Sequence, residues 1–248
     1  MNRRDWVPVA PAWERNPDDN EIWRRVTVLP SLALNRTELE LLLPVSGGPV
    51  AVIGVGDGNA ALALTAGGTR VTAIDASQSL LDMLMIRARL CGVEIELVQS
   101  DLTDLSGVLD SSCARAYAAQ LPSKTCDLGG FYAAAFRVLM PGGRLVVNEY
   151  HPFRRIWKQE SGPPLLAHSY FQHSLEMDED CAADPTRPGA ELGGTEYLWT
   201  ISDHVHFITA AGFRVAALEE VGEVRQHWEL PNLRGLPEQL ILAADKPE

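Results

Sequence analysis

From residue 50 to residue 148 the sequence alternates between short apolar, β-branched runs and longer segments with helical periodicity. The pattern predicts strands at 50–53, 70–74, 93–98 and 144–148, and helices at 59–66, 77–90 and 124–139. Parallel strands need crossover connections, and helices usually supply them, which covers both faces of the sheet. The alternation therefore predicts a doubly wound α/β fold with a mostly parallel sheet.

The flanking regions extend this core, and we expect one domain over residues 1–248, because 46% hydrophobic content suffices for one sizeable core. Residues 1–45 are interpreted as an irregular arm followed by a helix at 31–43, with Ser31 as its cap. The core spans 46–149, and the period dissolves over 150–198, which is interpreted as an insertion covering the sheet's open end. A helix at 201–211 and strands at 213–218 and 239–243 complete 199–248.

Three glycines, Gly54, Gly56 and Gly58, end the first predicted strand and open the helix that follows it. Bare backbone N–H groups beside the positive end of a helix suit a nucleotide-like ligand. A dinucleotide fingerprint would read GxGxxG with a small final residue, whereas this loop reads GxGxG followed by Asn59. The spacing disfavours a nicotinamide-dependent oxidoreductase.

Two aspartates follow the next two predicted strands. Asp75 ends the second strand, 21 residues after Gly54, where a carboxylate can accept hydrogen bonds from two ribose hydroxyls. Asp101 follows the third strand, where its side chain can bind the amino group of an adenine. The alternative for each is a turn or helix cap, and for Asp101 the two interpretations are equally supported. Together the acids fit one adenosine.

These pieces resemble the class I S-adenosylmethionine-dependent methyltransferases of the small-molecule type, the methyltransferase-11 group. The resemblance rests on VAVIGVGDGNAALALTAGGTRVTAIDAS, VQSDL and FRVLMPGGRLVVNEYHP within residues 50–149, and resumes at WTISDHVHFITAAGF. It implies a seven-stranded Rossmann-like sheet and S-adenosylmethionine as cofactor, with S-adenosylhomocysteine as product. It assigns the glycines to the methionine end, Asp75 to the ribose and Asp101 to the adenine. The cofactor-binding residues expected in all are Gly54, Gly56, Asp57, Gly58, Asn59, Asp75, Ala76, Asp101 and Leu102.

Two features depart from the family pattern. The family usually carries an acid two residues before the first glycine, where this chain has Val52. Loss of that carboxylate weakens cofactor binding by about 1–2 kcal/mol unless another residue replaces it. The fourth strand is expected within residues 110–123, which are polar and broken. Methylation of the amino groups of nucleic-acid bases usually goes with an Asn/Asp-Pro-Pro-aromatic motif, and the chain has no such motif.

Candidate catalytic residues are expected where the fourth and fifth strands end, the crevice in which open α/β sheets bind ligands. His151 is the first choice for a base, because a histidine is largely neutral near pH 7. Its neighbours Tyr150 and Glu149, and Tyr117 from the fourth strand, are further candidates. The alternative for His151 is a turn residue that hydrogen-bonds the backbone. His204 and His206 do not share a helical face, so no metal site is expected.

A formal charge of −12 would repel a phosphate backbone, so nucleic acid is not an expected partner. No apolar stretch reaches the length of about 20 residues that a membrane helix needs. The N-terminus lacks the apolar core of a signal peptide, and the four cysteines show no metal-like spacing. The expected protein is cytoplasmic, and its oligomeric state is left open, a homodimer included.

The expected reaction is methyl transfer to oxygen, nitrogen or carbon of a small, apolar or ring-containing metabolite, since the insertion is rich in aromatic residues. In an alternative interpretation the protein has the same fold and binds the same cofactor but transfers no methyl group. In that case the protein is a cyclase or rearrangement enzyme, or a binding module. Val52 and the broken fourth strand keep this alternative open beside the leading interpretation.

Overall fold

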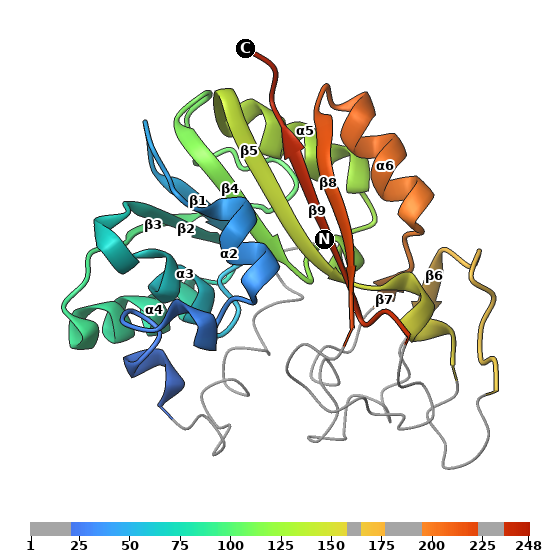
Figure 1. The fold of residues 1–248 in the computed structure, drawn as a ribbon, viewed down its shortest axis with the longest axis horizontal. Helices are drawn as coiled ribbons and strands as arrows, with labels where there is room; N and C mark the ends of the chain where they lie inside the picture. Colours follow the sequence, from blue (N-terminus) through green and yellow to red (C-terminus); the bar gives the residue numbers. More distant parts are fainter. Residues whose placement is uncertain (1–20, 158–164, 177–194, 223–235) are drawn as a thin grey trace.

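The computed structural model describes residues 21–157, 165–176, 195–222 and 236–248 (Figure 1). Its main sheet has seven strands in the order β3-β2-β1-β4-β5-β9-β8, and β9 runs antiparallel to both of its neighbours. The strands are β1 (Val50–Ile53), β2 (Val71–Asp75), β3 (Glu96–Gln99), β4 (Cys113–Ala119), β5 (Leu139–Tyr150), β8 (Arg214–Val221) and β9 (Gln239–Asp245). This is the predicted Rossmann-like sheet, and the carboxyl ends of all its strands except β9 lie at one edge.

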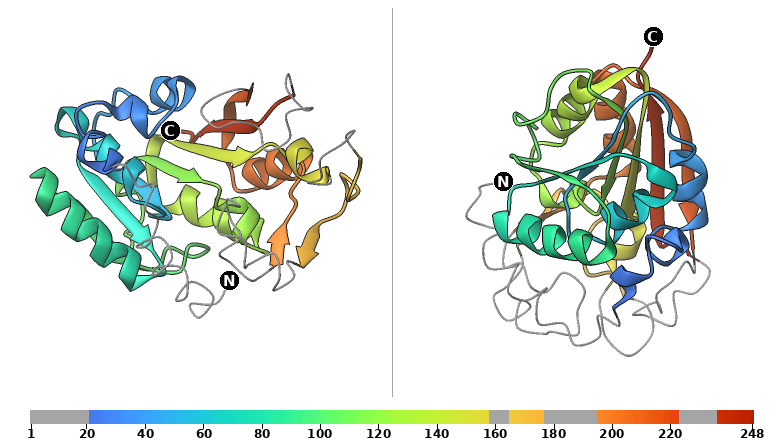
Figure 2. Two further views of the ribbon diagram at one scale, coloured as in Figure 1. Left: turned by 90° about the horizontal axis from the view of Figure 1, so that it is seen from below. Right: turned by 90° about the vertical axis from the view of Figure 1, so that its left-hand side faces the viewer.

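Helices cover both faces of this sheet, and α2 and α5 lie on opposite sides of it (Figure 2). The helices are α2 (Arg36–Leu42), α3 (Asn59–Leu64), α4 (Gln78–Cys91), α5 (Leu128–Val138) and α6 (Ile201–Ala210). Strand β1 shows the division, because Val52 packs with α2, α3 and α4 whereas Ile53 packs with α5 and α6. Alternate side chains of a strand point to opposite faces, so a strand buried on both sides is apolar throughout.

Short 3₁₀ helices and a separate pair of strands complete the described elements. The 3₁₀ helices are η1 (Ile22–Arg24), η2 (Pro30–Leu32), η3 (Ala66–Gly68), η4 (Pro122–Lys124) and η5 (Pro152–Ile156). Within the expected insertion, β6 (Ser174–Glu176) pairs antiparallel with β7 (Thr195–Tyr197). The rest of the insertion, 158–164 and 177–194, lies outside the described residues, as do residues 1–20 of the expected arm.

The helix expected at 31–43 is shorter than predicted and begins elsewhere. Asn35, not Ser31, is its cap: the Asn35 side chain accepts the Glu38 N–H at 2.9 Å, and the Glu38 carboxylate accepts the Asn35 N–H at 2.6 Å. This reciprocal capping box satisfies two N–H groups that a helix start leaves without partners. The preceding residues form η2 instead.

The fourth strand is complete, which corrects the expectation of a broken segment at 110–123. Residues 115–118 of β4 pair with β1 on one side, and residues 113 and 115–119 pair with β5 on the other. Cys113, Ala116 and Ala118 are buried. Small side chains gave a weak strand pattern, but the two neighbouring strands supply the hydrogen bonds that fix it.

Strand β5 also differs from the prediction, because it starts at Leu139 rather than after the Pro141-Gly142-Gly143 turn. Its register against β4 shifts between the Cys113–Leu139 and Arg115–Arg144 pairs, so residues 140–143 form an irregularity inside the strand.

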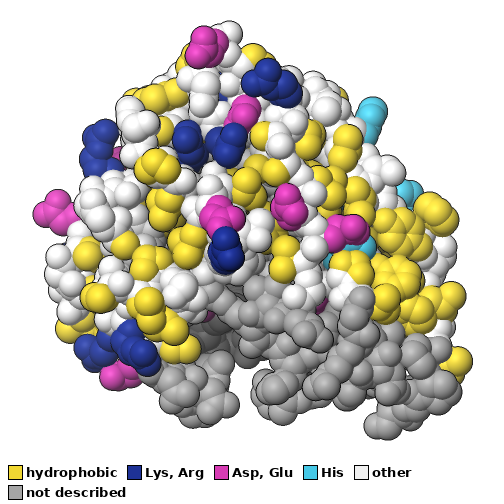
Figure 3. All heavy atoms as spheres, viewed as in Figure 1, with side chains coloured by type: hydrophobic (Ala, Val, Ile, Leu, Met, Phe, Trp, Pro, Cys, Tyr) yellow, Lys and Arg dark blue, Asp and Glu magenta, His cyan; other side chains and the backbone are white. Residues whose placement is uncertain are grey.

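Among the described residues, no helix combines the length and the apolar character needed to cross a bilayer. On the face seen in Figure 3, apolar side chains gather on the side where segment 165–176 lies in Figure 1. Leu165, Leu166 and Phe171 of that segment are exposed. The described part of the insertion therefore exposes large apolar side chains among polar ones.

Candidate functional site

The glycine loop between β1 and α3 needs its three glycines for backbone geometry. Gly54, Gly56 and Gly58 have φ angles of +82°, +54° and +76°, in the left-handed region that disfavours other residues. A Cβ at Gly58 would lie 3.1 Å from Cδ1 of Leu84, whereas a Cβ at Gly56 would meet no atom within 4 Å. Gly56 therefore borders open space, where a side chain would compete with a ligand.

Asp75 joins the ends of β1 and β2. Its side chain is only 2% exposed. Oδ2 accepts the Val55 N–H at 2.7 Å and Oδ1 accepts the Ser77 N–H at 2.8 Å. Burial raises the pKa of Asp75, and these backbone N–H groups oppose that rise. The Ala76 N–H also interacts with this carboxylate, and because a carboxylate has about four acceptor sites, the group that holds the loop keeps capacity for a further hydrogen bond.

Asp101 lies at a pocket of about 320 Å³ beside the ends of β2 and β3. The pocket is lined by Ala76, Asp101, Leu102, Thr103, Leu121, Lys124, Thr125 and Phe131. Asp101 Oδ1 accepts the Thr103 N–H at 2.8 Å and the Thr103 hydroxyl at 2.6 Å. Partial burial raises the pKa of Asp101, but these hydrogen bonds outweigh it and the pKa is lowered. Asp101 therefore forms a turn and lines the pocket, so the two interpretations are not exclusive.

Asp57 and Asn59 stabilise the glycine loop from within. The Asp57 carboxylate accepts the Asn59 backbone N–H at 2.9 Å and the Asn59 side-chain amide at 2.7 Å. Arg87 of α4 donates to the Asp57 carbonyl oxygen at 2.7 Å. Asn59 Oδ1 is buried and has no hydrogen bond within the described residues. A buried acceptor without a partner is costly, which points to a donor supplied by a ligand.

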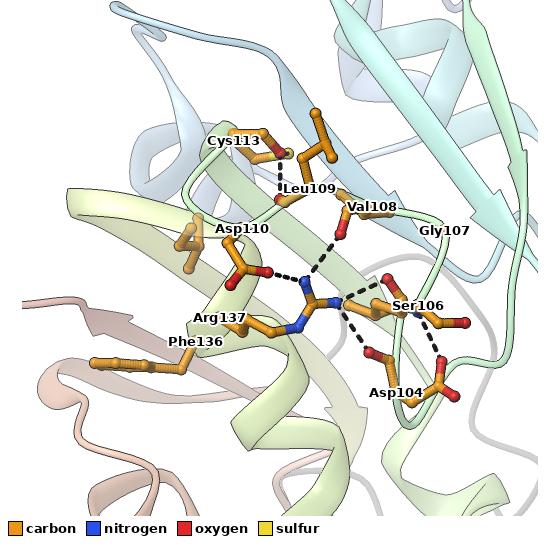
Figure 4. A network of polar contacts seen from close by, with 12 residues as sticks. Asp104, Ser106, Gly107, Val108, Leu109, Asp110, Cys113, Phe136 and Arg137 are labelled. Carbon is orange, nitrogen blue, oxygen red and sulfur yellow. Dashed lines mark hydrogen bonds and ion pairs between the residues drawn. The ribbon is translucent and has the colours of Figure 1, made fainter.

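The chain that follows Asp101 is held by Arg137 of α5 (Figure 4). One guanidinium nitrogen donates to the Val108 carbonyl at 2.9 Å and to the Asp110 carboxylate. The other donates to the carbonyls of Asp104 at 3.0 Å and Leu105 at 2.8 Å. The planar fork of an arginine suits such convergent acceptors. Arg137 thus fixes the β3–β4 loop that carries one wall of the pocket.

Of the catalytic candidates, Glu149 and Tyr150 lie together. Both line a second, open pocket, whose space of about 220 Å³ includes solvent at its mouth; its other lining residues are Ser123, Pro152, Tyr197, Leu198, Trp199 and His204. Glu149 Oε1 accepts the Tyr150 N–H at 2.7 Å, and Oε2 accepts the Ser123 N–H at 3.0 Å. The carboxylate thereby ties the end of β5 to η4.

His151 and Tyr117 lie elsewhere, which corrects their predicted grouping with Glu149. His151 is 4% exposed and lines neither of these pockets. Its Nδ1 accepts the Phe153 N–H at 3.1 Å, which caps η5, and its Nε2 lies 2.9 Å from Glu220 Oε1. Both ring nitrogens of His151 therefore have partners, as the turn-residue alternative expects, and its role as a base stays a prediction.

Tyr117 lies on the opposite face of the sheet, in the core beneath α2. Its hydroxyl donates to Glu38 Oε1 at 2.5 Å. Asn148 donates to the same oxygen at 2.7 Å. These bonds anchor α2 to β4 and β5, so Tyr117 stabilises the fold and does not face the second pocket.

The sequence analysis missed a buried pair in the second pocket's wall. The hydroxyl of Tyr132 on α5 lies 2.7 Å from Nδ1 of His204 on α6. Burial lowers the pKa of His204 to about 4, so the ring is neutral at pH 7, and burial raises the pKa of Tyr132. His204 lies one helical turn before the apolar Ile208. That spacing was a signal for a buried histidine.

Helix η4 borders both pockets and is held from the C-terminal half of the chain. Trp199 Nε1 donates to the carbonyls of Pro122 at 2.9 Å and Thr125 at 3.2 Å. Lys124 Nζ lies 3.1 Å from Glu196 Oε1, and both side chains are 15% exposed. Within the described ranges, no group of three or more histidines, cysteines or acids is arranged to hold a metal ion.

Comparisons with known proteins agree with this architecture. Residues 51–147 match the family model described as "Methyltransferase domain". A curated protein, the demethylmenaquinone methyltransferase of Clavibacter sepedonicus, is 31% identical over 138 residues, which are 53% of this chain and 49% of that protein. The chain thus spans about half the length of this curated relative.

Two solved structures share the fold. The S-adenosylmethionine-dependent methyltransferase of Mesorhizobium loti has a TM-score of 0.63 at 20% identity, over 82% of this chain and 94% of that one. The [4+2]-cyclase SpnF has a TM-score of 0.59 at 20% identity, over 90% of this chain and 80% of that one. Residues 51–147 of the chain therefore match a methyltransferase domain, and the chain shares the fold and sheet order of these solved methyltransferase-type structures.

Proposed function

We propose that the protein binds S-adenosylmethionine and transfers its methyl group to oxygen, nitrogen or carbon of a small molecule. The observation that carries this proposal is the convergence of the glycine loop, Asp75 and the Asp101 pocket at one edge of the sheet. An extended ligand with a charged end, a ribose and a flat base fits this sequence of surfaces.

In this proposal the open space beside Gly56 takes the methionine end of the cofactor, and Asp75 accepts from the ribose hydroxyls. The adenine lies in the pocket between Ala76 and Asp101. Asn59 Oδ1 accepts from the cofactor's amino group, which replaces the acid absent at Val52. A neutral acceptor makes a weaker bond than a carboxylate, so the expected affinity is lower than with the acid.

The acceptor is proposed to be a small ring-containing or apolar molecule bound in the second pocket. Its walls include Tyr150, Tyr197 and Trp199. The curated relative is named for demethylmenaquinone, which supports a ring as the acceptor. The methyl donor is intrinsically reactive, so this chain's residues have mainly to align the acceptor and exclude water.

Calorimetry with S-adenosylmethionine, S-adenosylhomocysteine and NADH tests the cofactor. Micromolar binding of the first two is expected, and tight binding of NADH alone refutes the proposal. Incubation with methyl-labelled cofactor and a panel of phenols, amines and quinols then tests transfer. The complete β4 removes one reason for a non-transferring cyclase or binding module. Cofactor binding with no product across the panel favours that alternative.

A further inference from the structure

The second pocket contains a buried ring nitrogen whose hydrogen-bonding capacity is unused among the described residues. His204 lines the pocket and is 1% exposed. Its Nδ1 is occupied by the Tyr132 hydroxyl at 2.7 Å. Its Nε2 is buried and makes no hydrogen bond within the part of the chain that the structure describes. Most buried polar atoms have a partner, so this nitrogen points to a ligand.

The pair itself determines which nitrogen carries the proton. If Nδ1 donated to Tyr132, the fully buried tyrosine hydroxyl hydrogen would need another acceptor, and its only described hydrogen bond is to His204. If Tyr132 donates to Nδ1, one bond gives the hydroxyl hydrogen an acceptor and gives Nδ1 a donor. The neutral ring then carries its hydrogen on Nε2, which becomes a donor without an acceptor.

The surroundings of this donor favour a flat ligand. Tyr197 and Trp199 have nearly parallel rings, with centroids 6.2 Å apart and planes at 18°. Both line the pocket, with Pro152 and Leu198. Aromatic and apolar walls stabilise a ring, and one polar group fixes its orientation.

We propose that the second pocket binds a ring compound with an oxygen substituent, and that His204 Nε2 donates a hydrogen bond to this oxygen. Tyr132 is a positioning residue, because it holds the tautomer that makes Nε2 a donor. The bond is stronger when the oxygen carries negative charge. The assignment of this ring as the methyl acceptor rests on the proposed function.

The test compares naphthol with methylnaphthalene substituted at the same carbon, using NMR titration of the full chain. The wild type, His204→Phe and His204→Gln are compared, since glutamine can place an N–H near the position of Nε2. The His204→Phe change is expected to lower the affinity for naphthol relative to methylnaphthalene by about 3- to 10-fold. His204→Gln is expected to restore part of that preference.

Nitrogen NMR of the His204 ring gives a second measurement that needs no ligand. The Nε2–H tautomer is expected in the wild type, and Tyr132→Phe is expected to disturb it. An Nδ1–H tautomer in the wild type overturns the inference, even if the His204 variants do not fold.

S-adenosylhomocysteine binding, measured on the same samples, separates this inference from the proposed function. If the protein binds S-adenosylhomocysteine but His204→Phe leaves the naphthol preference unchanged, the inference is wrong and the proposed function stands. If the preference depends on His204 but no S-adenosylhomocysteine binds, the pocket assignment stands and the proposed function is wrong.

Discussion

Replacement of Asp75 by Asn separates the two jobs assigned to this carboxylate. In the structure its two oxygens accept the Val55 and Ser77 N–H groups at 2.7 and 2.8 Å. Asparagine has one acceptor oxygen, so its amide must face one of these donors and leave that buried N–H without a partner. We expect the free energy of unfolding to fall by about 1–3 kcal/mol, the cost of one unsatisfied buried donor. Urea unfolding measures this loss.

The same change also affects the proposed ribose contact. A hydrogen bond to a charged acceptor contributes about 1.5–3 kcal/mol, so the Kd for S-adenosylhomocysteine should rise about 10- to 150-fold. Calorimetry measures this Kd without urea, at a temperature at which the variant is folded. Asp245→Asn is the matched control, because its carboxylate pairs with Arg144 and lines neither pocket. Weaker folding with unchanged affinity in Asp75→Asn refutes the ribose assignment.

Three further tests concern the glycine loop, the contacts of Arg137 and the buried His204. Gly56→Ala and Gly58→Ala each place alanine at a positive φ at a cost of about 1–2 kcal/mol, but only the second also crowds Leu84. Gly58→Ala should therefore have the lower unfolding temperature of the two variants. Gly56→Ala should have the weaker affinity for S-adenosylhomocysteine. The reverse order of affinities would contradict a cofactor site beside Gly56. Arg137→Leu should lower the free energy of unfolding by about 1–3 kcal/mol and speed amide hydrogen exchange in the β3–β4 loop. Unchanged exchange would show that the Arg137 hydrogen bonds do not hold this loop. The pKa of about 4 for His204 means that the unfolded state, with a pKa near 6.5, binds more protons below that pH. The free energy of unfolding should thus fall as pH drops from about 6.5 to 4, and the loss at pH 5 should be about 2 kcal/mol. Urea unfolding at pH 7 and pH 5 measures this loss. If the urea midpoint falls equally in the wild type and in His204→Gln, the prediction is wrong.

The sequence predicted the elements whose local pattern and tertiary role agree. Strand β1 is apolar at every position because helices cover both of its faces, and its bounds are as predicted. The start of α4 is as predicted too, because Ser77 caps it through a local hydrogen bond to Leu80. Strand β4 was missed because its alanines carry little strand signal. The partners that stabilise it, β1 and β5, are remote in sequence.

The site shows the same division. The glycine loop and Asp75 are separated by a fixed βαβ unit, so their meeting could be predicted from spacing. The placement of His151 away from Glu149 could not, because β5 ends at Tyr150 and His151 instead caps η5, where the alternation of the strand no longer applies. The Glu220 that engages His151 comes from β8, at the far edge of the sheet. His204 reaches the second pocket only through the packing of α6 against α5.

Helix η4 is only three residues long, yet each residue is tethered by a different remote group. Trp199 holds the Pro122 carbonyl, Glu149 holds the Ser123 amide, and the Lys124 ammonium pairs with β7. If a ligand in either pocket shifts η4, the ligands of the two pockets change each other's affinity by the same factor, whichever binds first.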